Sequence, residues 1–63
     1  MTVSERNNKY LASAYSLLVA KREMAELNPP LSDKIQNILD EVLDDWIAFG
    51  NKIKGESRES VSG

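Results

Sequence analysis

The 63-residue sequence contains no cysteine and no histidine. Without cysteine no disulfide can form, and without either residue the usual ligands of a structural zinc site are missing. A chain this short buries only a modest fraction of its surface when it folds alone, and such chains commonly gain stability from disulfides, a metal or a partner chain. The composition therefore predicts that this protein associates with another chain.

Motifs that carry enzymatic chemistry are also missing from the sequence. There is no glycine-rich phosphate loop, and no serine is flanked by glycines as it would be at a nucleophile elbow. A thin helical protein of this length also offers little material from which to build a catalytic pocket. We therefore expect no enzyme, no catalytic residue, no metal and no cofactor.

Long hydrophobic runs are scarce, and the stretch Tyr10–Ala20 is the one that needs testing as a targeting segment. It follows two basic residues and ends in small ones, as a secretory signal does, but Glu5 precedes it and Ser13 and Ser16 interrupt it. It is also too short to span a bilayer. We expect a cytoplasmic protein that does not contact a membrane, and the absence of cysteine fits a reducing compartment.

Proline occurs at two positions, Pro29 and Pro30, and this pair divides the chain into two segments of similar length. Proline restricts the residue before it and cannot donate the next helical hydrogen bond, so a helix should end there. The sequence predicts an all-α protein with one helix over about 4–27 and a second over about 32–54. A connection of roughly 28–31 is short enough that the two helices must lie antiparallel, as a hairpin.

The ends of the predicted helices carry capping signals. Thr2 and Glu5 have the spacing of a capping box for the first helix, and Ser32 is a suitable N-cap for the second. Gly55 is a reasonable residue to follow the second helix, which makes Gly50 an interior glycine. Residues 1–54 are thus expected to form one helical hairpin and residues 55–63 a flexible polar tail, because the tail has too few apolar side chains to fold.

The apolar pattern of the second segment is the strongest signal in the sequence. Its residues recur alternately four and three apart, which is an unbroken heptad seam. The seam consists of Ile35, Leu39, Val42, Trp46, Phe49 and Ile53. The matching column of the first segment contains Val3, Tyr10, Leu17 and Met24, with the polar residues Asn7 and Lys21 at or near the seam. We interpret Trp46 as a packed residue of this seam, because a lone aromatic in a heptad column is more often core than ligand platform.

Further apolar residues flank the seam and widen the apolar stripe beyond what one antiparallel neighbour covers. We predict that these flanking residues form an interface with another chain: Leu31, Ile38, Leu43, Ile47, Leu11 and Leu18. Two hairpins pairing into a four-helix bundle would cover them, so we expect a homodimer. The alternative is that the exposed apolar face is reserved for a different protein.

Charged residues suggest two further surfaces. The acidic residues Asp40, Glu41, Asp44 and Asp45 could dock a basic partner, although a charge run of this kind is commonly a solvated helix face. The basic residues of the first segment are the candidate nucleic-acid contacts: Arg6, Lys9, Lys21 and Arg22. We therefore predict a small non-enzymatic protein-interaction module, acting as a regulator, inhibitor or adaptor. An RNA- or DNA-binding regulator is the alternative.

Overall fold

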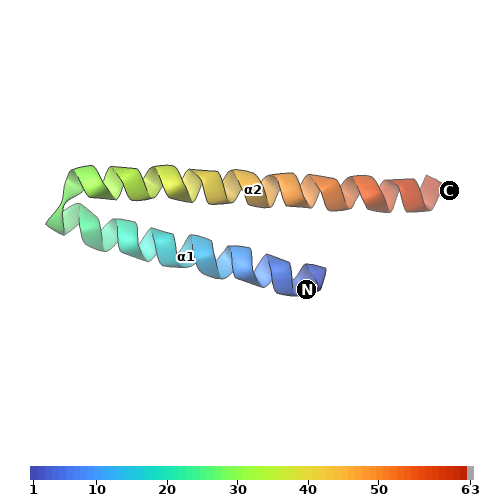
Figure 1. Ribbon diagram of the computed structural model, residues 1–63, viewed down its shortest axis with the longest axis horizontal. Helices are drawn as coiled ribbons and strands as arrows, with labels where there is room; N and C mark the ends of the chain where they lie inside the picture. Colours follow the sequence, from blue (N-terminus) through green and yellow to red (C-terminus); the bar gives the residue numbers. More distant parts are fainter. Residues whose placement is uncertain (63) are drawn as a thin grey trace.

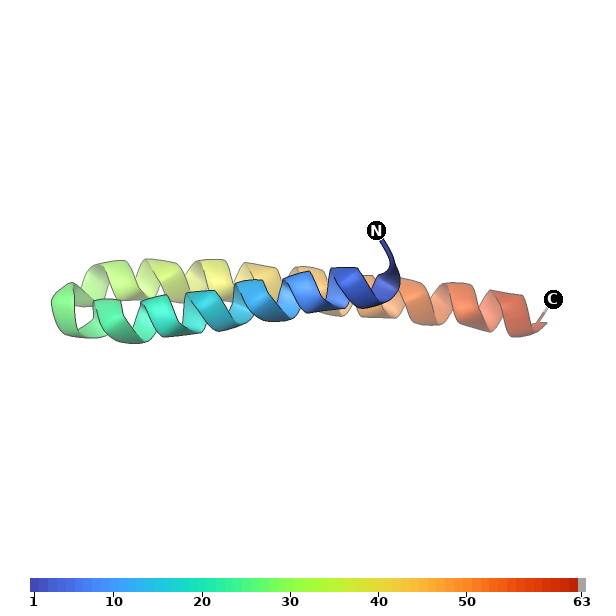
Figure 2. The ribbon, with the colours of Figure 1, turned by 90° about the horizontal axis from the view of Figure 1, so that it is seen from below.

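A computed structural model of the chain describes the backbone of residues 1–62 and the side chains of residues 1–55. It contains two α-helices, α1 (Val3–Leu27) and α2 (Pro29–Ser62), which pack against each other as an antiparallel hairpin (Figure 1). The turned view in Figure 2 shows α1 alongside α2 and α2 continuing past the N-terminus of α1. The predicted all-α hairpin is confirmed. The molecule measures 54 × 17 × 12 Å.

The start of α1 is set by the predicted capping residue. Thr2 has an extended backbone, and its hydroxyl oxygen accepts a hydrogen bond from the Glu5 backbone N–H at 3.1 Å. The same hydroxyl donates to the Glu5 carboxylate at 3.1 Å. The two side chains thus hold each other at the first turn, where the backbone N–H groups have no partner within the helix.

The connection between the helices is the single residue Asn28, shorter than the predicted four-residue loop. Its N–H donates to the carbonyl of Met24, and its own carbonyl accepts from Leu31 and Ser32. Asn28 therefore ends α1 and caps the beginning of α2. Both prolines lie in the first turn of α2, where their missing N–H groups would have no helical partner in any case.

The prediction that Ser32 caps the second helix is wrong. α2 begins at Pro29, so Ser32 lies inside the helix, where it is only 4% exposed. Its hydroxyl donates across the hairpin to the backbone carbonyl of Lys21 at 2.8 Å. A serine is small enough to let the two backbones approach this closely, and its hydroxyl satisfies its own hydrogen-bonding need by reaching the other helix.

The end of α2 also differs from the prediction, because the helical backbone continues from residue 54 to Ser62. Neither Gly50 nor Gly55 has a positive φ, so Gly55 does not form the left-handed cap that would end the helix. Gly50 is an interior helical glycine, as predicted. The side chains of 56–63 lie outside the described residues, and the flexibility of this tail stays a prediction.

Gly50→Ala should stabilise the protein. A Cβ added at Gly50 would meet no atom within 4 Å, so the substitution introduces no clash. Alanine loses less backbone freedom than glycine on entering a helix, and we expect a gain of about 1 kcal/mol in the free energy of unfolding. Urea unfolding followed by circular dichroism measures it. The reciprocal change at an exposed helical position, Ala48→Gly, should lower stability by a similar amount. Equal stabilities of the two variants would contradict the position of Gly50 inside a helix.

The seam residues predicted from the heptad pattern lie between the helices. Leu39 is 7% exposed and is the buried apolar residue of the described chain, and the other members of the seam are half-buried. The helix axes diverge from the connection toward the N-terminus of α1 (Figure 1). Their divergence follows side-chain size, because Ala20 and Ser32 pack near the connection, whereas Tyr10 and Trp46 pack near the open end.

Candidate interaction surfaces

Two cross-helix hydrogen bonds define one register along the hairpin. Ser32 reaches Lys21 near the connection, and the Trp46 indole N–H donates to the Asn7 side-chain oxygen at 3.1 Å near the open end. A polar residue in a seam commonly fixes register at some loss of stability, and here Asn7 satisfies the one polar group of the indole. The same register places Leu11 level with Leu43.

An aromatic cluster fills the space between the helices at the open end. The Tyr10 ring stacks on Trp46, with ring centroids 5.9 Å apart and planes 8° apart, and it meets Phe49 at 5.7 Å. The Tyr10 hydroxyl donates to the Asp45 carboxylate at 2.8 Å. The predicted packing of Trp46 in the seam is confirmed. Tyr15, in contrast, is 67% exposed, as its position five residues from Tyr10 predicts.

The flanking apolar residues divide between two opposite sides of the hairpin. Arg6, Ser13 and Asp45 line one hollow and therefore share a side. Ile38 lies on that side too, because it precedes Asp45 by two helical turns. Residues five apart on a helix point about 140° away from each other, so Leu43 points to the opposite side.

Leu11 and Leu18 follow Arg6 and Ser13 by five residues each, so they share the side of Leu43. Ile47 follows Leu43 by one turn and extends the same side. We call this surface the leucine face: Leu11, Leu18, Leu43 and Ile47. All four are exposed, and Ile47 is 63% exposed. Both helices contribute to it, whereas Leu31 and Ile38 lie on the other side of the seam and come from α2 alone.

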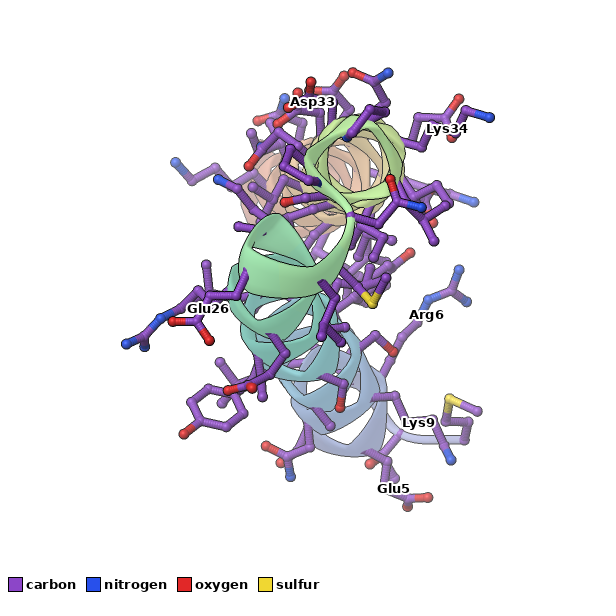
Figure 3. All side chains as sticks on the ribbon, turned by 90° about the vertical axis from the view of Figure 1, so that its left-hand side faces the viewer. Glu5, Arg6, Lys9, Glu26, Asp33 and Lys34 are labelled. Carbon is purple, nitrogen blue, oxygen red and sulfur yellow. The ribbon has the colours of Figure 1, made fainter. Side chains whose placement is uncertain are left out.

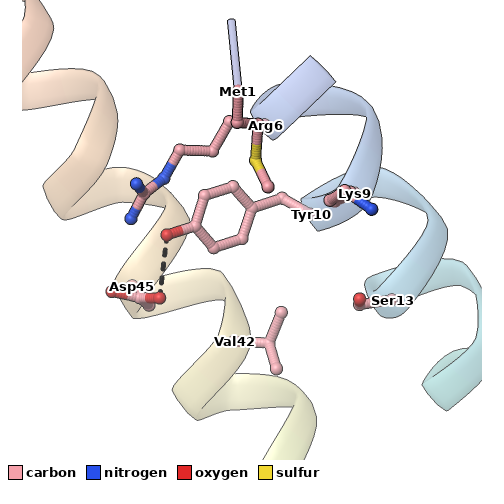
Figure 4. Close-up of a pocket in the computed structure, with 7 residues that line it drawn as sticks. All are labelled: Met1, Arg6, Lys9, Tyr10, Ser13, Val42 and Asp45. Carbon is pink, nitrogen blue, oxygen red and sulfur yellow. Dashed lines mark hydrogen bonds between the residues drawn. The ribbon is translucent and has the colours of Figure 1, made fainter. Parts of the chain in front are cut away.

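A groove runs along that other side at the open end (Figure 4). It consists of two adjoining hollows of about 330 and 280 Å³, which share Arg6, Tyr10 and Asp45. We call it the open-end groove, and its lining residues are Met1, Arg6, Lys9, Tyr10, Ser13, Val42, Asp45, Phe49, Lys52 and Ile53.

Arg6 is held in this groove by ring faces. Its guanidinium carbon lies 4.7 Å from the centre of the Phe49 ring and 5.9 Å from that of Tyr10. Contacts of this kind attract a cation to the negative face of the ring. A guanidinium over a ring face still has N–H groups that can meet a carboxylate.

The predicted acidic surface is only partly available for docking. Asp40, Glu41, Asp44 and Asp45 are all exposed, but two of them already accept hydrogen bonds within the hairpin. Asp45 accepts from Tyr10, and Asp40 accepts from the Gln36 amide at 2.7 Å. Within the residues whose side chains are described, no group of three or more carboxylates is arranged to hold a metal ion.

The four predicted nucleic-acid contacts do not form one surface. Arg6 and Lys9 project near the open end (Figure 3), whereas Lys21 is half-buried near the connection. Arg22 lies 16 residues from Arg6, which places it about 24 Å along α1 and about 160° around it. A continuous phosphate backbone could contact only part of this set.

Sequence reasoning named the residues of the leucine face together with Leu31 and Ile38 as one interface, and it missed the groove. It treated Tyr10 and Phe49 as seam residues and did not consider Lys52 or Met1 as part of a surface. The signal was present, because both rings occupy the same heptad column near the open end of an antiparallel pair. The register of the two antiparallel helices decides which rings meet and whether Arg6 covers them.

Comparison of the chain with protein families, with curated proteins and with solved structures finds no match. Neither helix, over its described residues, is both long and apolar enough to traverse a lipid bilayer. The candidate surfaces therefore have to be interpreted from their own geometry.

Proposed function

We propose that this protein is a non-enzymatic interaction module that acts as a homodimeric four-helix bundle. One observation carries the proposal: four large apolar side chains from both helices are exposed on one side of the hairpin, at Leu11, Leu18, Leu43 and Ile47. Apolar side chains gathered on one surface favour association, because burying each removes its area from water.

The side of the hairpin that carries the leucine face has about the area that a stable dimer interface needs. The two helices overlap along the 25 residues of α1. That overlap is about 37 Å long and, at roughly 10 Å per helix, about 20 Å wide, which offers roughly 700 Å². Stable protein complexes bury about 800 Å² on each partner. A second copy presenting the same face would therefore supply a matching area.

The residues on the two sides of the hairpin favour the leucine face as the dimer interface. On the side of Ile38, dimerisation would bring Arg6 and Asp45 into the interface, and desolvating charged side chains is costly. The leucine face also includes the polar Gln36, two turns before Leu43, but its large exposed side chains are apolar and come from both helices. A symmetric pairing through this face would keep Arg6 and Asp45 out of the interface.

Ile47→Lys tests the proposal with little damage to the hairpin itself, since Ile47 is 63% exposed there. In a dimer the change removes two buried apolar side chains and introduces two charges. Burial of each such side chain contributes about 1.5–3 kcal/mol, so the loss of two should raise the dimer Kd at least roughly 100-fold. Sedimentation equilibrium at micromolar concentration measures the shift from dimer to monomer, and circular dichroism reports whether the helices persist.

Ile38→Lys is the matched control, because Ile38 is 48% exposed and lies on the other side of α2. It should leave the dimer intact. A wild-type protein that sediments as a stable, cooperatively folding monomer would refute the homodimer. If Ile38→Lys dissociated the dimer and Ile47→Lys did not, the protein would still be a homodimer, but the leucine face would not be its interface.

We propose protein rather than nucleic acid as the further partner, because the basic residues of α1 are divided between opposite sides and ends of the helix. Binding of RNA or DNA remains the alternative and predicts a steep loss of affinity with salt. The cytoplasm is the proposed location, since a chain without cysteine suits a reducing compartment. A regulator, inhibitor or adaptor would use the surfaces that dimerisation leaves open.

A further inference from the structure

We infer that the open-end groove binds an acidic peptide segment of a partner protein, with a carboxylate on Arg6 and a neighbouring apolar side chain in the hollow above Val42. The inference deepens the proposed function as a protein-interaction module, but it does not require the dimer. The groove and the leucine face lie on opposite sides of the hairpin, so a dimer would leave both copies of the groove open.

Charge supports an acidic occupant. The groove is lined by Arg6, Lys9 and Lys52, with Asp45 the one carboxylate among its described lining residues. The local balance is therefore positive, although the whole chain has a net charge of −2. Asp45 is further engaged because it accepts the Tyr10 hydroxyl at 2.8 Å. Complementary charge of this kind favours encounter with a negatively charged partner and sets its orientation.

Arg6 is prepared for a carboxylate in a way that a mobile surface lysine is not. Its contacts with the Phe49 and Tyr10 rings restrict the side chain before any ligand arrives. Less side-chain freedom is then lost on binding, and the planar guanidinium can offer two parallel N–H donors to one carboxylate. Figure 4 shows Arg6 beside the Tyr10 ring with the hollow next to it.

The apolar part of the groove explains why the ligand should be a peptide with an apolar side chain. Met1, Tyr10 and Val42 line the hollow of about 330 Å³ beside Arg6. Phe49 and Ile53 line the second hollow, of about 280 Å³, on the other side of the shared residues. Two apolar depressions on either side of a cation match a segment in which apolar and acidic residues alternate.

Nucleic acid fits this groove less well. Tyr10 is already packed between Trp46 and Phe49, and Arg6 covers the Phe49 ring, so these ring faces are engaged within the hairpin rather than offered to a base. A second copy of the chain is another possible occupant, through the acidic residues Asp40, Glu41 and Asp44 of its α2.

The test uses the full chain and a fluorescein-labelled probe peptide of sequence Glu-Asp-Phe-Glu-Asp-Leu, with Gln-Asn-Phe-Gln-Asn-Leu as the uncharged control. Fluorescence anisotropy should show binding of the acidic peptide at sub-millimolar concentration and at least tenfold weaker binding of the control. Arg6→Gln should weaken binding about tenfold, and Lys52→Gln should weaken it less. Arg22→Gln, on the other side of α1, should not change it.

The outcomes separate the possible occupants. Chemical-shift changes at Arg6, Tyr10 and Lys52 on adding the peptide support the inference. No binding at millimolar peptide, or equal loss in Arg6→Gln and Arg22→Gln, overturns it. Tighter binding of a poly-uridine oligonucleotide, reduced by every basic substitution on α1, overturns it in favour of nucleic acid.

Loss of oligomers beyond the dimer in Arg6→Gln, with no peptide binding, overturns the inference in favour of a second copy. Peptide binding by Ile47→Lys separates this inference from the proposed dimer. That variant should bind the peptide as the wild type does, even when it sediments as a monomer. Helix content measured by circular dichroism controls for unfolding in each variant.

Discussion

Trp46→Ala should cause the largest loss of stability among single substitutions in the hairpin. The indole stacks on Tyr10 with centroids 5.9 Å apart, and its N–H donates to Asn7 at 3.1 Å. Truncation removes the ring contact, leaves Asn7 without this donor and opens a space at the widest part of the seam. We expect a loss of about 3 kcal/mol, at the lower end for such truncations because Trp46 is half-buried.

A thermal melt followed by circular dichroism at fixed protein concentration measures the loss. For a chain of this size, about 3 kcal/mol corresponds to a fall of roughly 12–24 °C in Tm. Trp46→Phe keeps an aromatic ring but removes the hydrogen bond, and we expect it to lose about 1 kcal/mol. If Trp46→Ala melted like the wild type, the aromatic cluster would contribute nothing to the hairpin.

Leu39→Ala should be nearly as destabilising, for a different reason. Leu39 is 7% exposed and lies at the middle of the seam, where neighbouring side chains from both helices surround it. Removing its branched end loses apolar burial and leaves a cavity, which together cost about 2–3 kcal/mol. The free energy of unfolding in urea, again at one protein concentration, gives the value.

Leu27→Ala is the matched control for Leu39→Ala, because it removes the same side-chain atoms at an exposed position. Leu27 is 78% exposed at the end of α1, so the same truncation there should change stability by less than about 0.5 kcal/mol. Similar losses at both positions would mean that the seam is not packed as described. A large loss at Leu39 alone supports the heptad assignment.

Several features of the fold could be predicted from the sequence because they depend on neighbours along the chain. The capping pair Thr2 and Glu5 lies within one turn, and the seam from Ile35 to Ile53 follows from helical periodicity. The prolines correctly marked the break between helices. The prediction placed them in the loop, but both lie in the first turn of α2, where proline is well tolerated.

The role of Ser32 could not be read from its neighbours. Its hydroxyl has a plausible local use as a cap, and only the close approach of α1 offers the carbonyl of Lys21 instead. The placement of the apolar residues that flank the seam also depended on the other helix. Sequence periodicity placed Leu31, Ile38, Leu43 and Ile47 beside the seam, but the prediction treated them as one interface.

The sequence by itself determined that this protein forms two helices, that the second is amphipathic with a heptad seam, and that its apolar stripe is wider than one antiparallel neighbour covers. Those properties follow from residue type and spacing, which act within a few helical turns. The tertiary structure decided which side of each helix remains exposed, that Trp46 meets Asn7, and that Arg6 lies over Phe49. These pairings join residues about 40 positions apart, and they exist only after the register of the antiparallel helices is set.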